Sequence, residues 1–107
     1  MTEKQFETAF TAAGAWFFLT EYELIKNWKG QKDTLIDLIF KTGIDSERKG
    51  TVTRVNAIKR IIESNMAKLA LKKIRNSSKI IENHSDAKEL AELLLNKYHS
   101  TDKESES

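Results

Sequence analysis

The chain has 107 residues, of which 39% are hydrophobic and 32% charged, and its formal net charge is +2. This length allows one domain with its own core but not two. The absence of cysteine excludes disulfides, thiolate metal sites and cysteine nucleophiles. The longest dense apolar run, residues 12–19, is far shorter than the roughly 20 residues of a membrane span, and the start, MTEKQFE, lacks the basic residues of a signal peptide. We therefore expect a cytoplasmic protein that does not enter the membrane.

The first thirty residues are expected to be helical. Thr2 and Gln5 have the spacing of a capping box, in which each side chain binds a backbone N–H group that the helix leaves free. Apolar residues then recur at helical spacing, at Phe6, Ala9, Phe10, Ala13 and Phe17. We expect Gly14 to permit a close helix crossing rather than to break the helix, and the sequence leaves open whether residues 3–29 form one helix or two.

The middle of the chain predicts a short helix, a loop and a long helix. Asp33 is a suitable N-cap for residues 34–42, which are apolar nearly all round and are predicted to form the most buried helix. A polar loop over residues 45–50 precedes a helix that is predicted from about residue 51 to residue 76. The core face of this long helix is predicted to consist of Val55, Ile58, Ile62, Met66 and Leu69. Because Ile74 leaves this face, we expect a bend or a second packing partner near the end of the helix.

The end of the chain predicts one more helix and a tail. A helix over about residues 86–99 carries Ala87, Leu90, Ala91, Leu94 and Tyr98 on one side. Residues 100–107 contain no apolar side chain and are predicted to be a disordered tail. Nothing alternates with the period of a β-strand. The fold class is therefore predicted to be all-α, with a single domain over residues 1–99 that packs four or five helices into a bundle.

The charges are distributed unevenly along the chain. Residues 41–79 hold eleven basic and three acidic side chains, net +8, whereas residues 1–40 have net −2 and residues 80–107 net −4. Within the basic segment, one predicted helical stripe consists of Lys68, Lys72, Arg75 and Lys79. Like charges at this spacing repel, so the stripe favours a negative group nearby. Three remain open: the phosphates of DNA or RNA, the chain's own acidic last helix (Asp86, Glu89, Glu92), or an acidic partner protein.

The first hypothesis is a small nucleic-acid-binding protein, such as an accessory factor of a phage, plasmid or mobile element. The short helix, the loop and the start of the long helix resemble a helix-turn-helix, although a turn of eight residues is longer than the usual three or four. The residues expected to face the groove are Thr51, Thr53, Arg54 and Asn56. Those expected to contact phosphates are Arg48, Lys49, Lys59 and Arg60, together with Lys68, Lys72, Arg75 and Lys79.

The alternative hypothesis is a non-enzymatic helical interaction module, acting as an adaptor or inhibitor and expected to be a homodimer. Its support is the surplus of large aromatic residues near the start of the chain. Because adjacent residues on a helix point in different directions, at least one of Trp16, Phe17 and Phe18 must meet another surface. An exposed aromatic interface is predicted at Trp16, Phe18 and Trp28.

No motif predicts an enzyme. The pattern Glu47-x-Lys49 after several aspartates resembles a nuclease metal site, but that site needs neighbouring strands, and none is predicted here. His84 and His99 are expected to be a loop residue and a residue at a frayed helix end, because neither has a second histidine at helical spacing. We therefore expect no catalytic residues, no metal, no cofactor and no small-molecule substrate.

Overall fold

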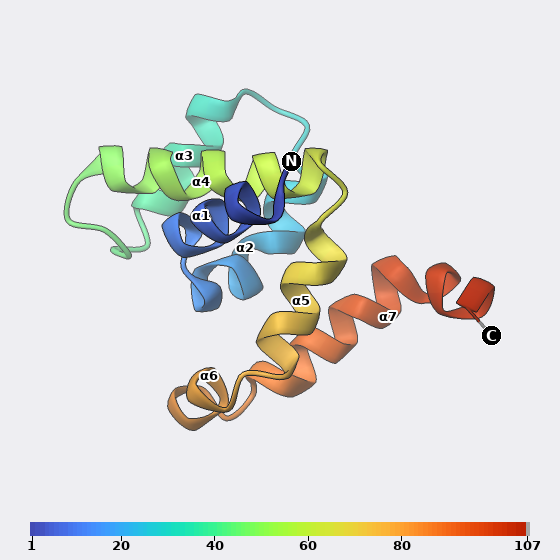
Figure 1. Cartoon of the computed structure of the whole chain (residues 1–107). Coiled ribbons are helices and arrows are strands. Elements are labelled where there is room, and N and C mark those ends of the chain that lie inside the picture. Colours follow the sequence, from blue (N-terminus) through green and yellow to red (C-terminus); the bar gives the residue numbers. More distant parts are fainter. Residues whose placement is uncertain (107) are drawn as a thin grey trace.

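The computed structural model of the chain describes the backbone of residues 1–106 and the side chains of residues 1–99. The described backbone is all-helical and contains no strand, which confirms the predicted fold class (Figure 1). The predicted number of four or five helices is wrong, since there are seven. They are α1 (Glu3–Ala13), α2 (Ala15–Asn27), α3 (Lys32–Phe40), α4 (Arg48–Glu63), α5 (Ala67–Arg75), α6 (Ser78–Asn83) and α7 (Ala87–Glu106).

The first extra helix boundary lies at Gly14. The capping box at the start of α1 is confirmed, with the Gln5 backbone N–H 3.1 Å from the Thr2 hydroxyl and the Thr2 N–H 2.9 Å from the Gln5 side chain. Gly14 has φ +82° and separates α1 from α2, so the expectation that it would not break the helix is wrong. A Cβ at this position would also lie 2.6 Å from the Nη1 atom of Arg54. The backbone angle therefore favours glycine, and a side chain at this position would also displace the end of Arg54.

The second boundary divides the predicted long helix. Asn65 adopts φ +60° between α4 and α5, and the helix axis changes direction there. The core face shifts as a result: Ile61 and Ile74 are fully buried, whereas Leu69 is 41% exposed. Of the predicted core face, Val55 and Ile58 are fully buried and Ile62 and Met66 are half-buried against the core, whereas the prediction is wrong at Leu69.

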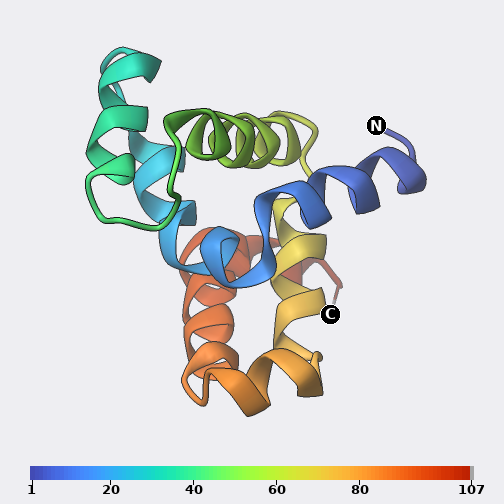
Figure 2. The same ribbon diagram turned by 90° about the vertical axis from the view of Figure 1, so that its left-hand side faces the viewer.

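The helices are arranged around α4. This helix packs against α1, α2 and α3, and α5 packs against α7. In Figure 2, α4 (green) lies along the upper side of the molecule between α1 (dark blue) and α3 (cyan to green), and α5, α6 and α7 lie below. Because α3 is at the edge, its Leu38 is 46% exposed and the prediction that it would be the most buried helix is wrong. The side of α4 that faces away from the core carries exposed residues along its length, among them Lys49, Thr53, Arg60 and Glu63.

The last helix follows the predicted pattern over its described side chains. Ala87, Ala91 and Leu94 are buried against the core, as predicted. The helix is assigned as far as Glu106, but residue 107 and the side chains of residues 100–106 lie outside the described part, so the disordered tail stays a prediction. In the described part of the chain, no helix combines the length and apolar character that crossing a membrane requires.

Candidate nucleic-acid interface

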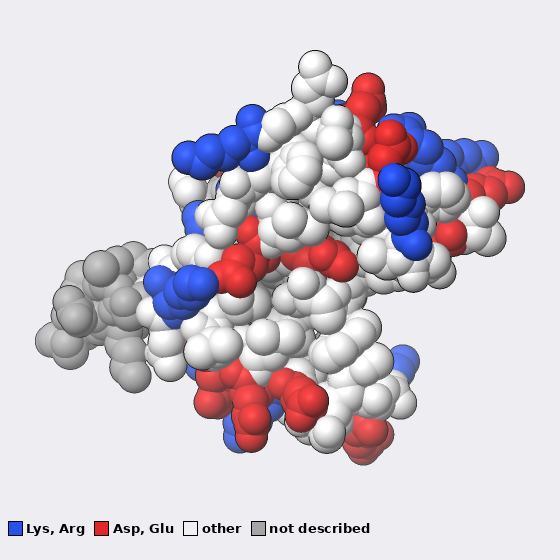
Figure 3. All heavy atoms as spheres, turned by 180° about the vertical axis from the view of Figure 1, so that it is seen from behind, with Lys and Arg blue, Asp and Glu red and all other residues white. Residues whose placement is uncertain are grey.

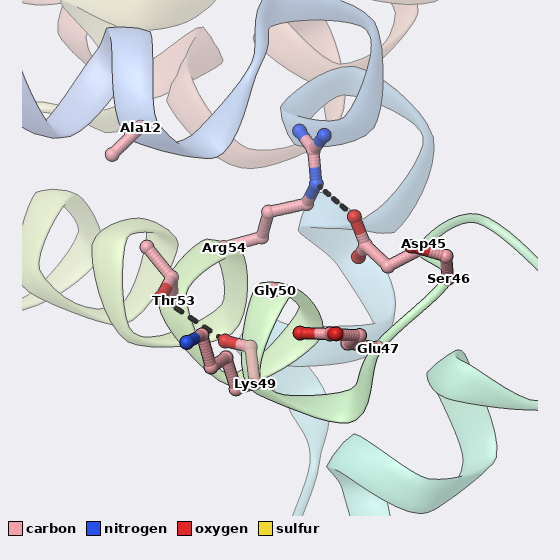
Figure 4. Close-up of a pocket in the computed structure, with 8 residues that line it drawn as sticks. All are labelled: Ala12, Asp45, Ser46, Glu47, Lys49, Gly50, Thr53 and Arg54. Carbon is pink, nitrogen blue, oxygen red and sulfur yellow. Dashed lines mark hydrogen bonds and ion pairs between the residues drawn. The ribbon is translucent and has the colours of Figure 1, made fainter.

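The loop before α4 is fixed by Asp45. Its carboxylate accepts hydrogen bonds from the Thr51 hydroxyl at 2.9 Å and from Arg54 Nε at 3.1 Å. Arg54 Nη1 also donates to the carbonyl oxygen of Ala13 at 2.8 Å, at the end of α1. Figure 4 shows Arg54 reaching away from α4 to meet Asp45. Thr51 is fully buried, so the prediction that it faces a groove is wrong. The side chain of Arg54 connects α4 to the loop and to α1.

Arg48 is bound to α3. Its Nε atom donates to Asp37 at 2.7 Å, and its guanidinium lies 3.6 Å from Asp33. The hydrogen bond to Asp37 raises the pKa of Arg48. The aspartates that resembled part of a nuclease site therefore bind arginine side chains. Among the described residues, no three acidic or histidine side chains converge to hold a metal.

The hollow in Figure 4 lies beside this loop. It has a volume of about 360 Å³ and is bounded by Ala12 of α1, by loop residues including Glu47, and by Lys49 and Thr53 of α4. Its walls combine two acidic side chains, Asp45 and Glu47, and two basic ones, Lys49 and Arg54, with small residues.

The uncovered face of α4 carries four of the predicted contact residues. We call Lys49, Thr53, Asn56 and Arg60 the α4 stripe. At 100° per residue these four positions lie within about 60° of one another. Three of the side chains are exposed and that of Asn56 is half-buried, while the opposite side of the same helix is fully buried. The sequence could place these four residues on one helix, and the structure shows that they share its outward face.

A lysine from α3 completes this surface. Lys32 Nζ donates to the Asn56 Oδ1 atom at 3.0 Å, although the two residues are 24 positions apart. Lys59 is half-buried at the edge of the stripe. Within the part of the chain whose side chains are described, Lys49, Lys59 and Arg60 form no ion pair. The sequence analysis missed Lys32, because only the packing of α3 on α4 brings it to the stripe.

The later basic residues do not form the predicted continuous stripe. We call Lys68, Lys72 and Arg75 the α5 stripe; Lys79 lies beyond the end of α5, on α6. Lys68 borders a hollow with Tyr22 and His99, and Arg75 borders another with Glu92 of α7. The α5 stripe therefore runs along the side of α5 that lies next to α7.

Acidic residues gather on α6 and α7, and others lie near α4, among them Glu63 at its end and Asp33 and Asp37 of α3. Figure 3 shows that acidic side chains predominate on the lower part of the back face, where α6 and α7 lie. The exposed acidic residues there, among the described side chains, are Glu82 of α6, Asp86 of the connection, and Glu89 and Glu92 of α7. One ion pair joins α5 to another helix, between Lys73 and Glu7 of α1. Figures 1 and 2 place α4 on the opposite side of the molecule from α6.

The predicted aromatic interface is contradicted at Phe18, which is fully buried in the core. Trp16 is half-buried and stacks on His84, with ring centroids 3.9 Å apart and the planes nearly parallel. The indole N–H of Trp28 donates to the carbonyl oxygen of Gln31 at 2.9 Å. The aromatic residue that had to meet another surface is therefore Trp16, and that surface belongs to the same chain.

Comparison with known proteins returns no match, whether to a protein-family model, a curated protein or a solved structure.

Proposed function

We propose that this protein binds nucleic acid through the exposed face of α4. The observation that supports it most directly is the α4 stripe itself, which presents Lys49 and Arg60 at its two ends with Thr53 and Asn56 between them. Cations attract the phosphate backbone, and hydroxyl and amide groups between them hydrogen-bond to phosphates or base edges. The same helix is held firmly from behind, because its inner face is buried and Arg54 ties it to α1.

The α5 stripe is the weaker candidate for this role. Arg75 borders the same hollow as Glu92, so an acidic residue of the same chain lies near it. The acidic α6–α7 side would also repel a phosphate backbone that approached from there. Lys49, Lys59 and Arg60 of α4, by contrast, have no ion-pair partner among the described side chains, although Glu63 is exposed on the same face beyond Arg60.

The test is a binding titration with labelled DNA and RNA at 50 and 200 mM salt. If Lys49, Lys59 and Arg60 each neutralise one phosphate, affinity should fall by about 40-fold across this range. The double variant Lys49→Glu/Arg60→Glu should abolish binding at 50 mM salt. The matched control, Lys72→Glu/Arg75→Glu, makes the same change in charge on α5 and should bind like the wild type.

Two results would contradict this proposal. One is the absence of binding to any nucleic acid at 50 mM salt by a folded wild-type protein. The other is an equal loss of affinity in the α4 and α5 double variants, which would show that only net charge matters. Circular dichroism of each variant checks that the helices are intact.

A second candidate function is protein interaction, which Leu93 favours. Its side chain is 61% exposed on α7, the largest exposed fraction among the large apolar residues of the described part. An exposed leucine among acidic side chains is a suitable contact for a second copy or for another protein. Light scattering of the wild type and of Leu93→Ser tests this role. A monomeric wild type would exclude the homodimer.

A further inference from the structure

We propose that the nucleic acid bound by the α4 stripe is duplex DNA, contacted in the major groove, and that Asn56 donates a hydrogen bond to a base edge. This inference rests on the proposed function and narrows it to one class of ligand and one reading residue. Three features of the structure support it: the shape of the exposed surface, its lack of aromatic rings, and the hydrogen bond between Lys32 and Asn56.

The shape of the surface favours duplex DNA. The stripe lies on the uncovered side of a 16-residue helix, which is about 24 Å long. The major groove of B-DNA, about 12 Å wide, admits a helix, whereas the major groove of A-form RNA is too narrow and deep for side chains to read. In Figure 2, α1 and α3 lie on either side of α4, so they would lie near the two phosphate backbones when α4 faces the groove.

The composition of the surface disfavours single strands. Proteins that bind single-stranded nucleic acid stack its bases on exposed aromatic rings. α4 contains no aromatic residue. Trp28, four positions before Lys32, is half-buried and its indole N–H is bound to Gln31. Phe40 of α3 is also half-buried, and Tyr98 of α7 hydrogen-bonds to Glu23. The α4 stripe therefore offers charges and hydrogen-bonding groups, but no platform on which a base could stack.

The orientation of the Asn56 amide follows from its partner. A lysine ammonium group only donates hydrogen bonds, so the atom of Asn56 that faces Lys32 must be the amide oxygen. The amide nitrogen then remains as the group that can act on a ligand, and it only donates. Of the acceptors that base edges present in the major groove, we assign N7 of a purine to the Asn56 amide, because every base pair contains one. The Asn56 amide nitrogen therefore donates a hydrogen bond to an acceptor on a base edge, and Lys32 sets the orientation of the amide.

The first experiment compares ligands. Fluorescence anisotropy at 50 mM salt measures binding to a duplex DNA of about 24 base pairs, to duplex RNA of the same sequence and to the single DNA strand. The wild type should prefer duplex DNA by at least about tenfold, and methyl green, which occupies the major groove, should displace it. Equal or tighter binding of RNA or of the single strand would overturn this inference. If Lys49→Glu/Arg60→Glu loses that binding, the proposed function still stands. Binding to none of the three would overturn both.

The second experiment tests the donor role of Asn56. In a duplex built with 7-deazapurines, the N7 acceptors are replaced by C–H groups, and the wild type should bind it about two- to tenfold more weakly than the unmodified duplex. Asn56→Ala should bind the two duplexes equally. Asn96→Ala, the same change at an exposed site on α7, should retain the wild-type difference. If Asn56→Ala keeps that difference as well, Asn56 is not the donor.

Discussion

Replacing Gly14 by alanine should destabilise the fold more than the same change at Gly43, the other glycine with positive φ. Gly14 joins α1 to α2 with φ +82° and ψ 127°, a combination that is accessible almost only to glycine. The added Cβ would lie 2.6 Å from Nη1 of Arg54, which is closer than the two atoms can pack. Arg54 would have to move away from Ala13, whose carbonyl oxygen it binds at 2.8 Å.

The magnitude follows from these two effects. The backbone strain costs about 1–3 kcal/mol, and a weakened hydrogen bond from a charged donor costs about 1.5 kcal/mol or more. We expect Gly14→Ala to lower the free energy of unfolding by about 3 kcal/mol, which corresponds to a fall in Tm of about 15 °C for a domain of this size. The matched control is Gly43→Ala: Gly43 has φ +81°, but no atom lies within 4 Å of its added Cβ. This control should cost only about 1 kcal/mol.

The assay is urea unfolding followed by circular dichroism, with the double variant Gly14→Ala/Arg54→Ala included. Once the guanidinium has been removed, the alanine at position 14 should cost only the backbone strain. The cost of Gly14→Ala should therefore fall by about 1.5 kcal/mol in the Arg54→Ala background. The reasoning is refuted if Gly14→Ala costs no more than Gly43→Ala, or if its cost is the same with and without Arg54.

Three further predictions concern the core and two titrating side chains. Ile74→Ala should lower the free energy of unfolding by about 2–5 kcal/mol and Leu69→Ala by less than about 1 kcal/mol, because only Ile74 is fully buried. Urea unfolding measures both values, and a larger loss for Leu69→Ala would indicate that α4 and α5 form one helix. The hydrogen bond from Lys97 lowers the pKa of Glu23 below its ordinary value of 4.5. The contribution of this pair to stability is therefore fully present above pH 4.5 and is lost as the pH falls through the lowered pKa. The unfolding free energies of wild type and Glu23→Gln should therefore converge below pH 4.5, and a constant difference would contradict the assignment. Burial raises the pKa of Tyr22 to about 12. An absorbance titration should therefore show one tyrosine transition at high pH that is absent from Tyr22→Phe. A Tyr22 transition near the ordinary value of 10.0 would argue against burial.

The parts of the fold that could be predicted from the sequence depend on contacts between near neighbours. The capping box of α1 involves Thr2 and Gln5, three positions apart, and the apolar stripe of α7 repeats every three or four residues. The helix boundaries at Gly14 and Asn65 could not be predicted in this way. A glycine is tolerated inside a helix at modest cost, and an asparagine gives only a weak turn signal, so packing against distant helices decides both. The predicted core face failed beyond Asn65 for this reason.

The same limit applies to the candidate interface. Thr53 and Arg54 are adjacent in the sequence, and no local rule shows that one is exposed while the other turns toward Ala13, 41 residues away. The direction of Arg54 is set by Asp45 and by the end of α1, which only the folded chain brings together. The sequence could therefore indicate the helix that carries the interface, whereas the face of that helix follows from its tertiary contacts.

Some basic residues of α4 bind carboxylates of the same chain and others do not, and this difference determines which variants can test the proposed function. Arg48 and Arg54 stabilise the fold, because each binds a carboxylate from another segment. Lys49, Lys59 and Arg60 have no ion-pair partner among the described side chains, so reversing their charge removes no ion pair of the folded protein. A loss of binding in Arg54→Glu would not distinguish a lost phosphate contact from a displaced α4. A loss in Lys49→Glu/Arg60→Glu, with unfolding unchanged, would identify the α4 stripe as the binding surface.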